Sequence, residues 1–218
     1  MPVPQISRQP DALAWFDSVR GQPLLAAEQE LIGAAMAARP AQQPWLWLAP
    51  REPEPGIFDL PRRTLLLHRL QDRFSGSLHC GLPLPLPNES IGNLIVQHVL
   101  DDGTDGLLDE CVRVLEPGGR LWLFTLNPWS PYRARWRRSG LRACDVQRWR
   151  RTLRGLGLQP CAGEVVYLGP VWRMASDTGN STSGRLRAVC LLEFEKRSAA
   201  LIPPAPVTRR WQAGATPA

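Results

Sequence analysis

The spacing of apolar residues changes repeatedly along the chain, and this change predicts an α/β protein. Gly92 to Gln97 is a short apolar run of the kind that forms a strand buried on both faces. Arg120 to Leu126 is a second run of this kind. Between them, apolar residues recur at helical spacing, at Leu107, Leu108, Cys111, Val112 and Leu115. Strand, helix and strand in this order predict a βαβ unit, in which 92–97 and 120–126 are neighbouring parallel strands.

Capping and turn-forming residues flank the helix of this unit. Thr104 or Asp105 is placed to cap its first turn, and Pro117-Gly118-Gly119 is placed to end it. Similar patterns predict the other elements. We expect one or two helices within 11–38, broken at Gly21-Gln22-Pro23, a helix at 145–156, and strands at 45–48, 64–68, 77–80, 165–168 and 187–195.

Three motifs around the βαβ unit carry a resemblance to a known family. His98-Val99-Leu100-Asp101 ends the first strand, Arg113 to Gly119 reads Arg-Val-Leu-Glu-Pro-Gly-Gly, and Asn127-Pro128-Trp129-Ser130 follows the second strand. Together they resemble the second half of a class I S-adenosylmethionine-dependent methyltransferase. More narrowly, they resemble a bacterial group of small methyltransferases of the type-11 kind, in which Asn-Pro-Trp-Ser follows the fifth strand.

The resemblance extends over most of the chain and implies a complete fold. Trp15-Phe16 with Glu28-Gln29 near the start, and Leu191 to Lys196 with Leu201-Ile202-Pro203 near the end, agree with it. It implies a Rossmann-like, mostly parallel sheet of seven strands in the order 3-2-1-4-5-7-6, with helices on both faces and only the last strand antiparallel. The expected division is an N-terminal helical segment at 1–40, the methyltransferase-like domain at 41–197, and a flexible tail with prolines and arginines at 198–218.

Composition narrows the class of protein. The 218 residues suit one α/β domain. No apolar run approaches the ~18 residues that span a membrane, and the first residues lack a secretory pattern, so we expect a cytoplasmic protein. The five cysteines form no CxxC pair. Reduced thiols are therefore expected, with neither disulfides nor a metal site.

The net charge of +6 is unevenly distributed. Residues 1–130 hold 10 arginines against 15 acidic residues, whereas 131–218 hold 16 basic residues against 5 acidic ones. Nine arginines fall between Arg133 and Arg154. Such a block contacts nucleic acid or an acidic protein in some proteins, and forms a solvated surface in others. Both interpretations stay open for this block.

The resemblance also implies S-adenosylmethionine as cofactor. It places the cofactor against residues at the ends of the first four strands, at Ala49, Pro50, His68, Gly81, Leu82 and His98. Four features of the family pattern are altered in this chain. Prolines replace the glycine-rich turn after Leu48, His68-Arg69 replaces the ribose-binding acid, and Cys80 and Gly92 stand where the family has acids.

These departures lower the expected affinity for the cofactor. A proline has no N–H to donate, and an imidazole accepts only one of the two hydrogen bonds that a carboxylate accepts. Each lost charge-assisted hydrogen bond costs ~1.5–3 kcal/mol. We therefore predict that S-adenosylmethionine binds weakly or not at all, with a dissociation constant above the low micromolar range.

Polar and aromatic residues follow the fourth and fifth strands, at the edge where ligands bind in open α/β sheets. His98 and Asn127 are the candidate catalytic residues, although each also suits a purely structural role. Contacts with a substrate or partner are expected from Trp129, Tyr132, Arg135, Arg137 and Arg138. Two functions remain open: a methyltransferase of unknown acceptor, and a catalytically inactive relative that binds nucleic acid or an acidic partner through 133–154.

Overall fold

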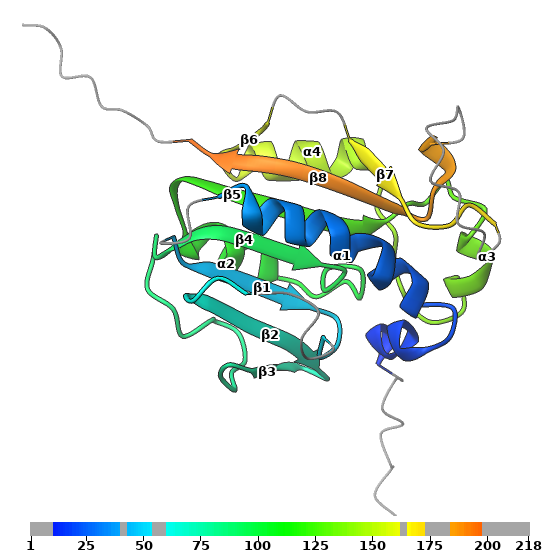
Figure 1. The fold of residues 1–218 in the computed structure, drawn as a ribbon, viewed down its shortest axis with the longest axis horizontal. Coiled ribbons are helices and arrows are strands. Elements are labelled where there is room, and N and C mark those ends of the chain that lie inside the picture. Colours follow the sequence, from blue (N-terminus) through cyan, green and yellow to red (C-terminus); the bar gives the residue numbers. More distant parts are fainter. Residues whose placement is uncertain (1–10, 40–42, 54–59, 162–164, 173–183, 198–218) are drawn as a thin grey trace, which may run out of the picture.

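The fold is a mixed, mostly parallel β-sheet between helices, seen in a computed structural model (Figure 1). The structure describes residues 11–39, 43–53, 60–161, 165–172 and 184–197. The predicted tail at 198–218 lies outside the described residues, as do 54–59 of the proline-rich turn. None of the helices in the described ranges combines the length and the apolar character that a membrane span requires.

The sheet contains eight strands, β1 (Trp45–Ala49), β2 (Thr64–Leu70), β3 (Arg73–Gly76), β4 (Ile91–Gln97), β5 (Leu115–Leu126), β6 (Leu158–Pro160), β7 (Val166–Leu168) and β8 (Val189–Lys196). Seven of them follow the order β3-β2-β1-β4-β5-β8-β6, and β7 pairs with β8 in addition. This order broadly matches the predicted 3-2-1-4-5-7-6 arrangement, with one strand more than predicted: the predicted sixth strand is β7, and β6 was not expected. The βαβ prediction is confirmed, because β4 and β5 are parallel neighbours whose register pairs Leu94 with Leu121.

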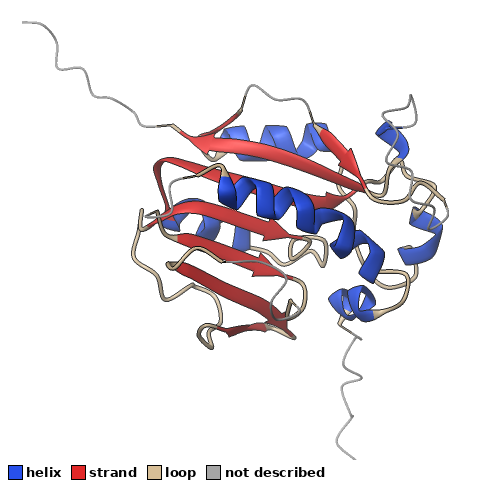
Figure 2. Ribbon diagram, in the orientation of Figure 1, coloured by secondary structure: helices blue, strands red, loops and turns tan. Residues whose placement is uncertain are grey.

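Helices cover both faces of the sheet, as predicted. The chain begins with the 3-10 helix η1 (Ala12–Asp17) and with α1 (Gln22–Ala37). Figure 1 shows α1 lying across one face, with α2 (Leu107–Val114) and α4 (Val146–Gly155) on the other. The short α3 (Arg133–Trp136) and η2 (Gly184–Leu186) lie in the connections around β5 and β8, as the colouring of Figure 2 makes plain.

The β3 edge of the sheet corrects the sequence prediction. The third strand is Arg73–Gly76 rather than 77–80, and it runs antiparallel to β2, so β8 is not alone in running antiparallel. Gln71 and Asp72 join β2 to β3 in a tight turn, and Gln71 has a φ of 55°. Only Cys80 of the predicted third strand forms a bridge, with Phe74. A hairpin therefore stands where a parallel third strand was expected.

Glycines at the amino ends of β4 and β5 allow these strands to approach closely. A Cβ on Gly92 would lie 2.7 Å from Oε1 of Glu116 in β5, and one on Gly119 would lie 3.1 Å from the Gly92 carbonyl oxygen in β4. Gly92 therefore serves packing at the amino edge, far along β4 from the carboxyl end that faces a ligand. The acid that the family has at this position would accordingly lie away from the carboxyl edge, where the resemblance places the cofactor.

Candidate functional site

A buried ionic cluster occupies the carboxyl ends of β1, β4 and β5. Nδ1 of His98 lies 2.7 Å from Oδ2 of Asp101, and Nε2 lies 2.6 Å from Oε1 of Glu28. All three side chains have 0% solvent exposure. We call these three residues the His98 cluster. It joins α1 to the loop after β4, two segments 70 residues apart in sequence.

Both carboxylates of the His98 cluster accept further hydrogen bonds from outside it. Oε2 of Glu28 accepts a hydrogen bond from Gln97 at 2.6 Å, and Gln97 in turn accepts one from Nε1 of Trp47 at 3.0 Å. Asp101 accepts hydrogen bonds from the Thr125 hydroxyl at 2.6 Å and from the Leu126 amide at 2.9 Å. Buried charges are tolerated when they are paired and hydrogen-bonded in this way.

The cluster holds a proton on His98. Burial alone would lower the pKa of this imidazole. The opposing effects are larger and raise the pKa to about 9: they are the negative charge of Glu28, the hydrogen bonds to Asp101 and Glu28, and the negative charge of Asp101. At neutral pH the side chain is therefore an imidazolium with both N–H groups donated. His98 has no free nitrogen with which to accept a proton from a substrate.

Phe16 of η1 covers the cluster from the outside. Its ring stacks on the His98 ring with centroids 4.5 Å apart, and Phe16 has 0% exposure. Ala49 and Pro50, at the end of β1, are also buried. The crevice above β1 and β4, where the strand order reverses and ligands bind in open α/β sheets, is therefore filled by side chains of this chain.

The predicted cofactor residues are thus only partly brought together. Ala49 pairs with His68 across β1 and β2, and His98 follows β4, so these residues share one edge of the sheet. Gly81 and Leu82 lie beyond β3, after the bridge formed by Cys80. A Cβ on Gly81 would meet nothing within 4 Å, so no close approach requires a glycine there.

A polar cavity of about 740 Å³ opens beside the filled crevice, at the carboxyl ends of β2 and β4. We call it the carboxyl-edge cavity. Charges of both signs line it in equal number, from Asp11, Asp72, Asp102, Arg69, Arg138 and Arg142, together with the hydroxyl of Thr104. Of these residues, only Arg138 belongs to the predicted site. A lining of balanced charge suits a ligand that itself carries both charges.

The wall of the carboxyl-edge cavity is ordered by a small network. Thr104 donates to Oδ1 of Asp102 through its amide at 2.7 Å and its hydroxyl at 2.6 Å. Nη2 of Arg69 donates to the Thr104 hydroxyl at 3.1 Å and lies 3.8 Å from Oδ2 of Asp102. The side chain of Arg142 lies against Gly103, whose missing Cβ would stand 3.1 Å from Nη1. Asp102 therefore keeps Oδ2 as an acceptor beside the guanidinium group of Arg69.

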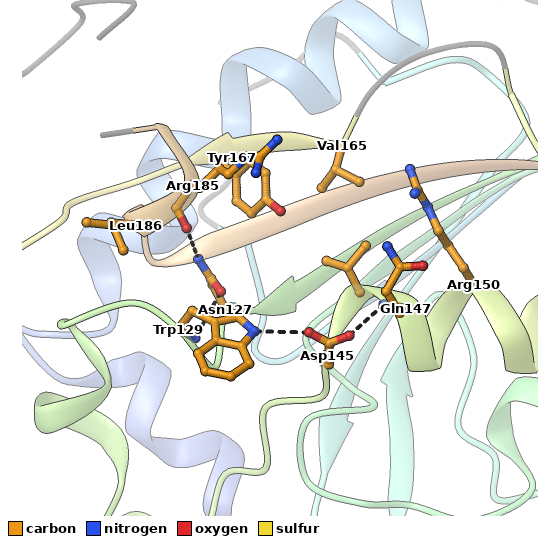
Figure 3. A pocket seen from close by; sticks show the side chains of 10 residues that line it. Asn127, Trp129, Asp145, Gln147, Arg150, Val165, Tyr167, Arg185 and Leu186 are labelled. Carbon is orange, nitrogen blue, oxygen red and sulfur yellow. Dashed lines mark hydrogen bonds between the residues drawn. The ribbon is translucent and has the colours of Figure 1, made fainter. Parts of the chain in front are cut away.

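A second cavity, of about 490 Å³, lies at the carboxyl end of β5, and we call it the β5 pocket (Figure 3). It is formed by the residues after β5, the first turns of α4, strand β7 and the helix η2. Asn127 and Trp129 belong to its lining, so two predicted residues meet here. Tyr167 and Arg150, which the sequence did not single out, face them across the pocket.

Asn127 is committed to a structural role. Its Nδ2 donates to the carbonyl oxygens of Arg185 at 2.9 Å and Arg187 at 2.7 Å, and its Oδ1 accepts from the Trp129 amide at 3.1 Å. Asn127 is 1% exposed. This side chain therefore ties the loop after β5 to the residues that precede β8. Because every donor and acceptor of its amide is paired, it has no group left to bind a substrate.

The remaining predicted contact residues separate into buried and exposed positions. Tyr132 is buried, and its hydroxyl donates to the Arg20 carbonyl oxygen at 2.8 Å, so it anchors the N-terminal segment. The side chains of Arg135 and Arg137 are exposed on the surface of the arginine block. The Arg135 carbonyl oxygen accepts a hydrogen bond from Nε1 of Trp15 at 3.3 Å.

Comparison with solved structures identifies the fold. The chain is similar to a chain of the Haloferax volcanii complex between the methyltransferase activator Trm112 and a methyltransferase, with a TM-score of 0.53 and 14% identity over 88% of this chain and 99% of that one. It is also similar to an S-adenosylmethionine-dependent methyltransferase from Thermotoga maritima, with a TM-score of 0.51 and 15% identity over 84% and 93% of the two chains.

A third similar structure is the geranyl diphosphate C-methyltransferase from Streptomyces coelicolor, solved with Mg²⁺, geranyl diphosphate and S-adenosyl-L-homocysteine, with a TM-score of 0.51 and 12% identity over 80% of each chain. No protein-family profile matches the chain. No curated sequence matches it. The chain therefore has the class I methyltransferase fold, and its activity has to be argued from its own residues.

Proposed function

We propose that this chain is an S-adenosylmethionine-dependent methyltransferase that holds its cofactor in the carboxyl-edge cavity. The observation that supports it best is the balanced charge of this cavity, on a fold that methyltransferases share. S-adenosylmethionine carries a sulfonium, an ammonium, a carboxylate and a ribose diol. When bound, it supplies a methyl group that is activated by the positive sulfur.

The lining residues match these groups in kind. Asp72 and Oδ2 of Asp102 would accept hydrogen bonds from hydroxyl or ammonium groups, because carboxylates are acceptors of both. Arg138 and Arg142 would pair with the carboxylate. The resemblance places the ribose-binding acid at His68, but β2 runs to Leu70, and Asp72 follows it at the cavity.

The residues of the filled crevice do not fit the cofactor. Pro50 lacks the N–H that the family's turn offers, Phe16 covers the end of β4, and His98 has no free nitrogen. The predicted weak affinity, with a dissociation constant above the low micromolar range, therefore stays part of the proposal. The contribution of the protein to methyl transfer is then positioning of the two reactants, which requires few reacting side chains.

Isothermal titration calorimetry with S-adenosylmethionine and S-adenosylhomocysteine tests the site. Asp72→Asn removes one carboxylate charge from the cavity and should weaken binding about tenfold or more. The matched control is Asp109→Asn, which removes an exposed carboxylate from the first turn of α2, away from the cavity. Equal affinities of the two variants, or no binding at millimolar concentration, would refute the assignment.

The filled crevice supports a second candidate function. A chain whose crevice is closed by Phe16 and the His98 cluster is compatible with a methyltransferase-like protein that has lost catalysis and acts as a binding or scaffold module. Its partner would be nucleic acid or an acidic protein, held by the arginine block of 133–154. Membership of the bacterial type-11 group and a cytoplasmic location also stay predictions.

A further inference from the structure

The β5 pocket presents an aromatic surface that the fold itself does not use. Trp129 is 72% exposed, although indole is among the costliest side chains to leave in water. Its ring is nevertheless held in place, because Nε1 donates to Oδ2 of Asp145 at 3.0 Å and the backbone amide donates to Asn127. An ordered, exposed indole beside a cavity is a ready surface for a planar ring to stack on.

The same pocket contains unneutralised positive charge. Arg150 and Arg185 line it, and Nε of Arg150 is buried without a hydrogen-bond partner among the described residues. The one carboxylate in the lining, Asp145, is already engaged. Its Oδ2 accepts from Trp129, and its Oδ1 accepts from the Gln147 amide at 2.8 Å, where it caps α4. These two contacts hold the pKa of the Asp145 carboxyl below its usual value.

A neutral donor completes the lining. Burial raises the pKa of the Tyr167 hydroxyl, so this group stays protonated at neutral pH and can donate a hydrogen bond. Asn127 contributes no free polar atom, because its amide is fully paired within the chain. Gln147 adds an amide that both donates and accepts, and the other polar groups left for a ligand are donors, namely two guanidinium groups and one phenol. A lining in which charged donors predominate favours an anion.

We infer that the β5 pocket is a binding site for a planar aromatic carboxylate. The ring would stack on Trp129, and the carboxylate would pair with Arg150 and receive a hydrogen bond from Tyr167 (Figure 3). The volume of about 490 Å³ is within the range of small-molecule sites and accommodates a fused two-ring acid. The inference goes beyond the proposed function, because such binding does not depend on S-adenosylmethionine or on the carboxyl-edge cavity.

The test is a calorimetric titration with indole-3-carboxylate, without S-adenosylmethionine. Indole-3-carboxamide is the neutral counterpart of the same shape. We expect the acid to bind about tenfold or more tightly than the amide, since charge-assisted hydrogen bonds are about twice as strong as neutral ones. Equal affinities of acid and amide, or no binding of the acid at millimolar concentration, would overturn the inference.

Two variants locate the site. Arg150→Gln should weaken binding of the acid about tenfold and bring it level with the amide. Arg148→Gln is the control, because Arg148 is an exposed arginine of the same helix that does not line the pocket. Trp129→Ala should weaken the acid and the amide together, since stacking does not depend on charge. An Arg150→Gln variant that binds the acid as tightly as Arg148→Gln does would place the ligand elsewhere and refute the assignment.

Discussion

The buried His98 cluster makes the stability of the fold depend on pH. The imidazole has a pKa near 6.5 in the unfolded chain, and its two carboxylate partners raise it to about 9 in the folded protein. Each unit of such a shift corresponds to ~1.4 kcal/mol of stabilisation of the protonated form. The difference between the two states therefore contributes about 3 kcal/mol to the free energy of unfolding.

The sign of the effect follows from the direction of the shift. Below pH 6.5 the imidazole is protonated in both states, and the contribution of the cluster is complete. Between pH 6.5 and about 9 the unfolded chain has released the proton while the folded protein still holds it, so stability falls as the pH rises. Above the folded pKa the contribution is lost. This loss is a large fraction of the stability of a typical domain.

Urea denaturation at a series of pH values measures the effect. The free energy of unfolding of the wild-type chain should fall by about 3 kcal/mol between pH 6.5 and 9. His98→Gln is the comparison, because glutamine can donate a hydrogen bond but carries no charge. It should be destabilised at pH 6.5 by ~3–5 kcal/mol, since two buried carboxylates lose their cation.

The test compares how steeply the free energy of unfolding falls with pH in the wild type and in His98→Gln. The variant should show little of the wild-type decline between pH 6.5 and 9, because it lacks the group that titrates there. A wild-type slope that matches the slope of the variant would contradict the assignment of a proton to His98. It would also reopen the possibility that His98 is neutral at pH 7 and available as a base.

Three further predictions concern packing, thiols and charge. Phe16→Ala should cost ~3–5 kcal/mol in urea unfolding, because the ring is fully buried against His98, and a cost below 1 kcal/mol would show that η1 is not docked. Burial raises the pKa of the Cys111 thiol, so iodoacetamide should modify half-buried Cys80 before Cys111 in the native protein; equal rates at these two thiols would contradict the burial of α2. If the arginine block binds nucleic acid, log affinity should fall by ~0.7–0.9 per log unit of salt for each phosphate contacted. The control replaces Arg135, Arg137 and Arg138 together with glutamine. If this variant is retained on heparin as strongly as the wild type, the arginine block is only a solvated surface.

The central part of the fold was predictable because local patterns agree with the tertiary arrangement there. The run at 92–97, the helical spacing after it and the run at 120–126 became β4, α2 and β5. The predicted cap was wrong, since α2 begins after Gly106 with no side-chain hydrogen bond to its first turn. Asp145, in contrast, does cap the predicted helix at 145–156, by accepting from Gln147.

The edge strands were less predictable because they depend on pairing rather than on pattern. Residues 73–76 and 77–80 are both short and mixed in polarity, and only the hairpin with β2 shows which of them is the strand. Residues 158–160 form β6 although they hold a single buried residue, Leu158, because they pair with β8. Such a strand gives no periodic signal of its own.

The site was partly predictable. His98, Asn127 and Trp129 do lie at the carboxyl edge, as the motifs indicated. The carboxylates that accept hydrogen bonds from His98 include Glu28, far away in the sequence. The sequence held one indication of the role of Glu28. Glu28 lies four residues from both Leu24 and Ile32, on the buried stripe of α1, where a charged residue requires a partner. The partner could not be named without the tertiary structure.

The most direct test of the account is a crystal structure of the protein with S-adenosylhomocysteine. The account predicts ligand density in the carboxyl-edge cavity, in contact with Asp72 and Asp102, with Phe16 still stacked on an undisturbed His98 cluster. Density between β1 and β4, with Phe16 displaced and Glu28 separated from His98, would contradict it. That result would show that the cofactor binds in the crevice above β1 and β4. It would also show that Phe16 and the His98 cluster close this crevice only while the ligand is absent.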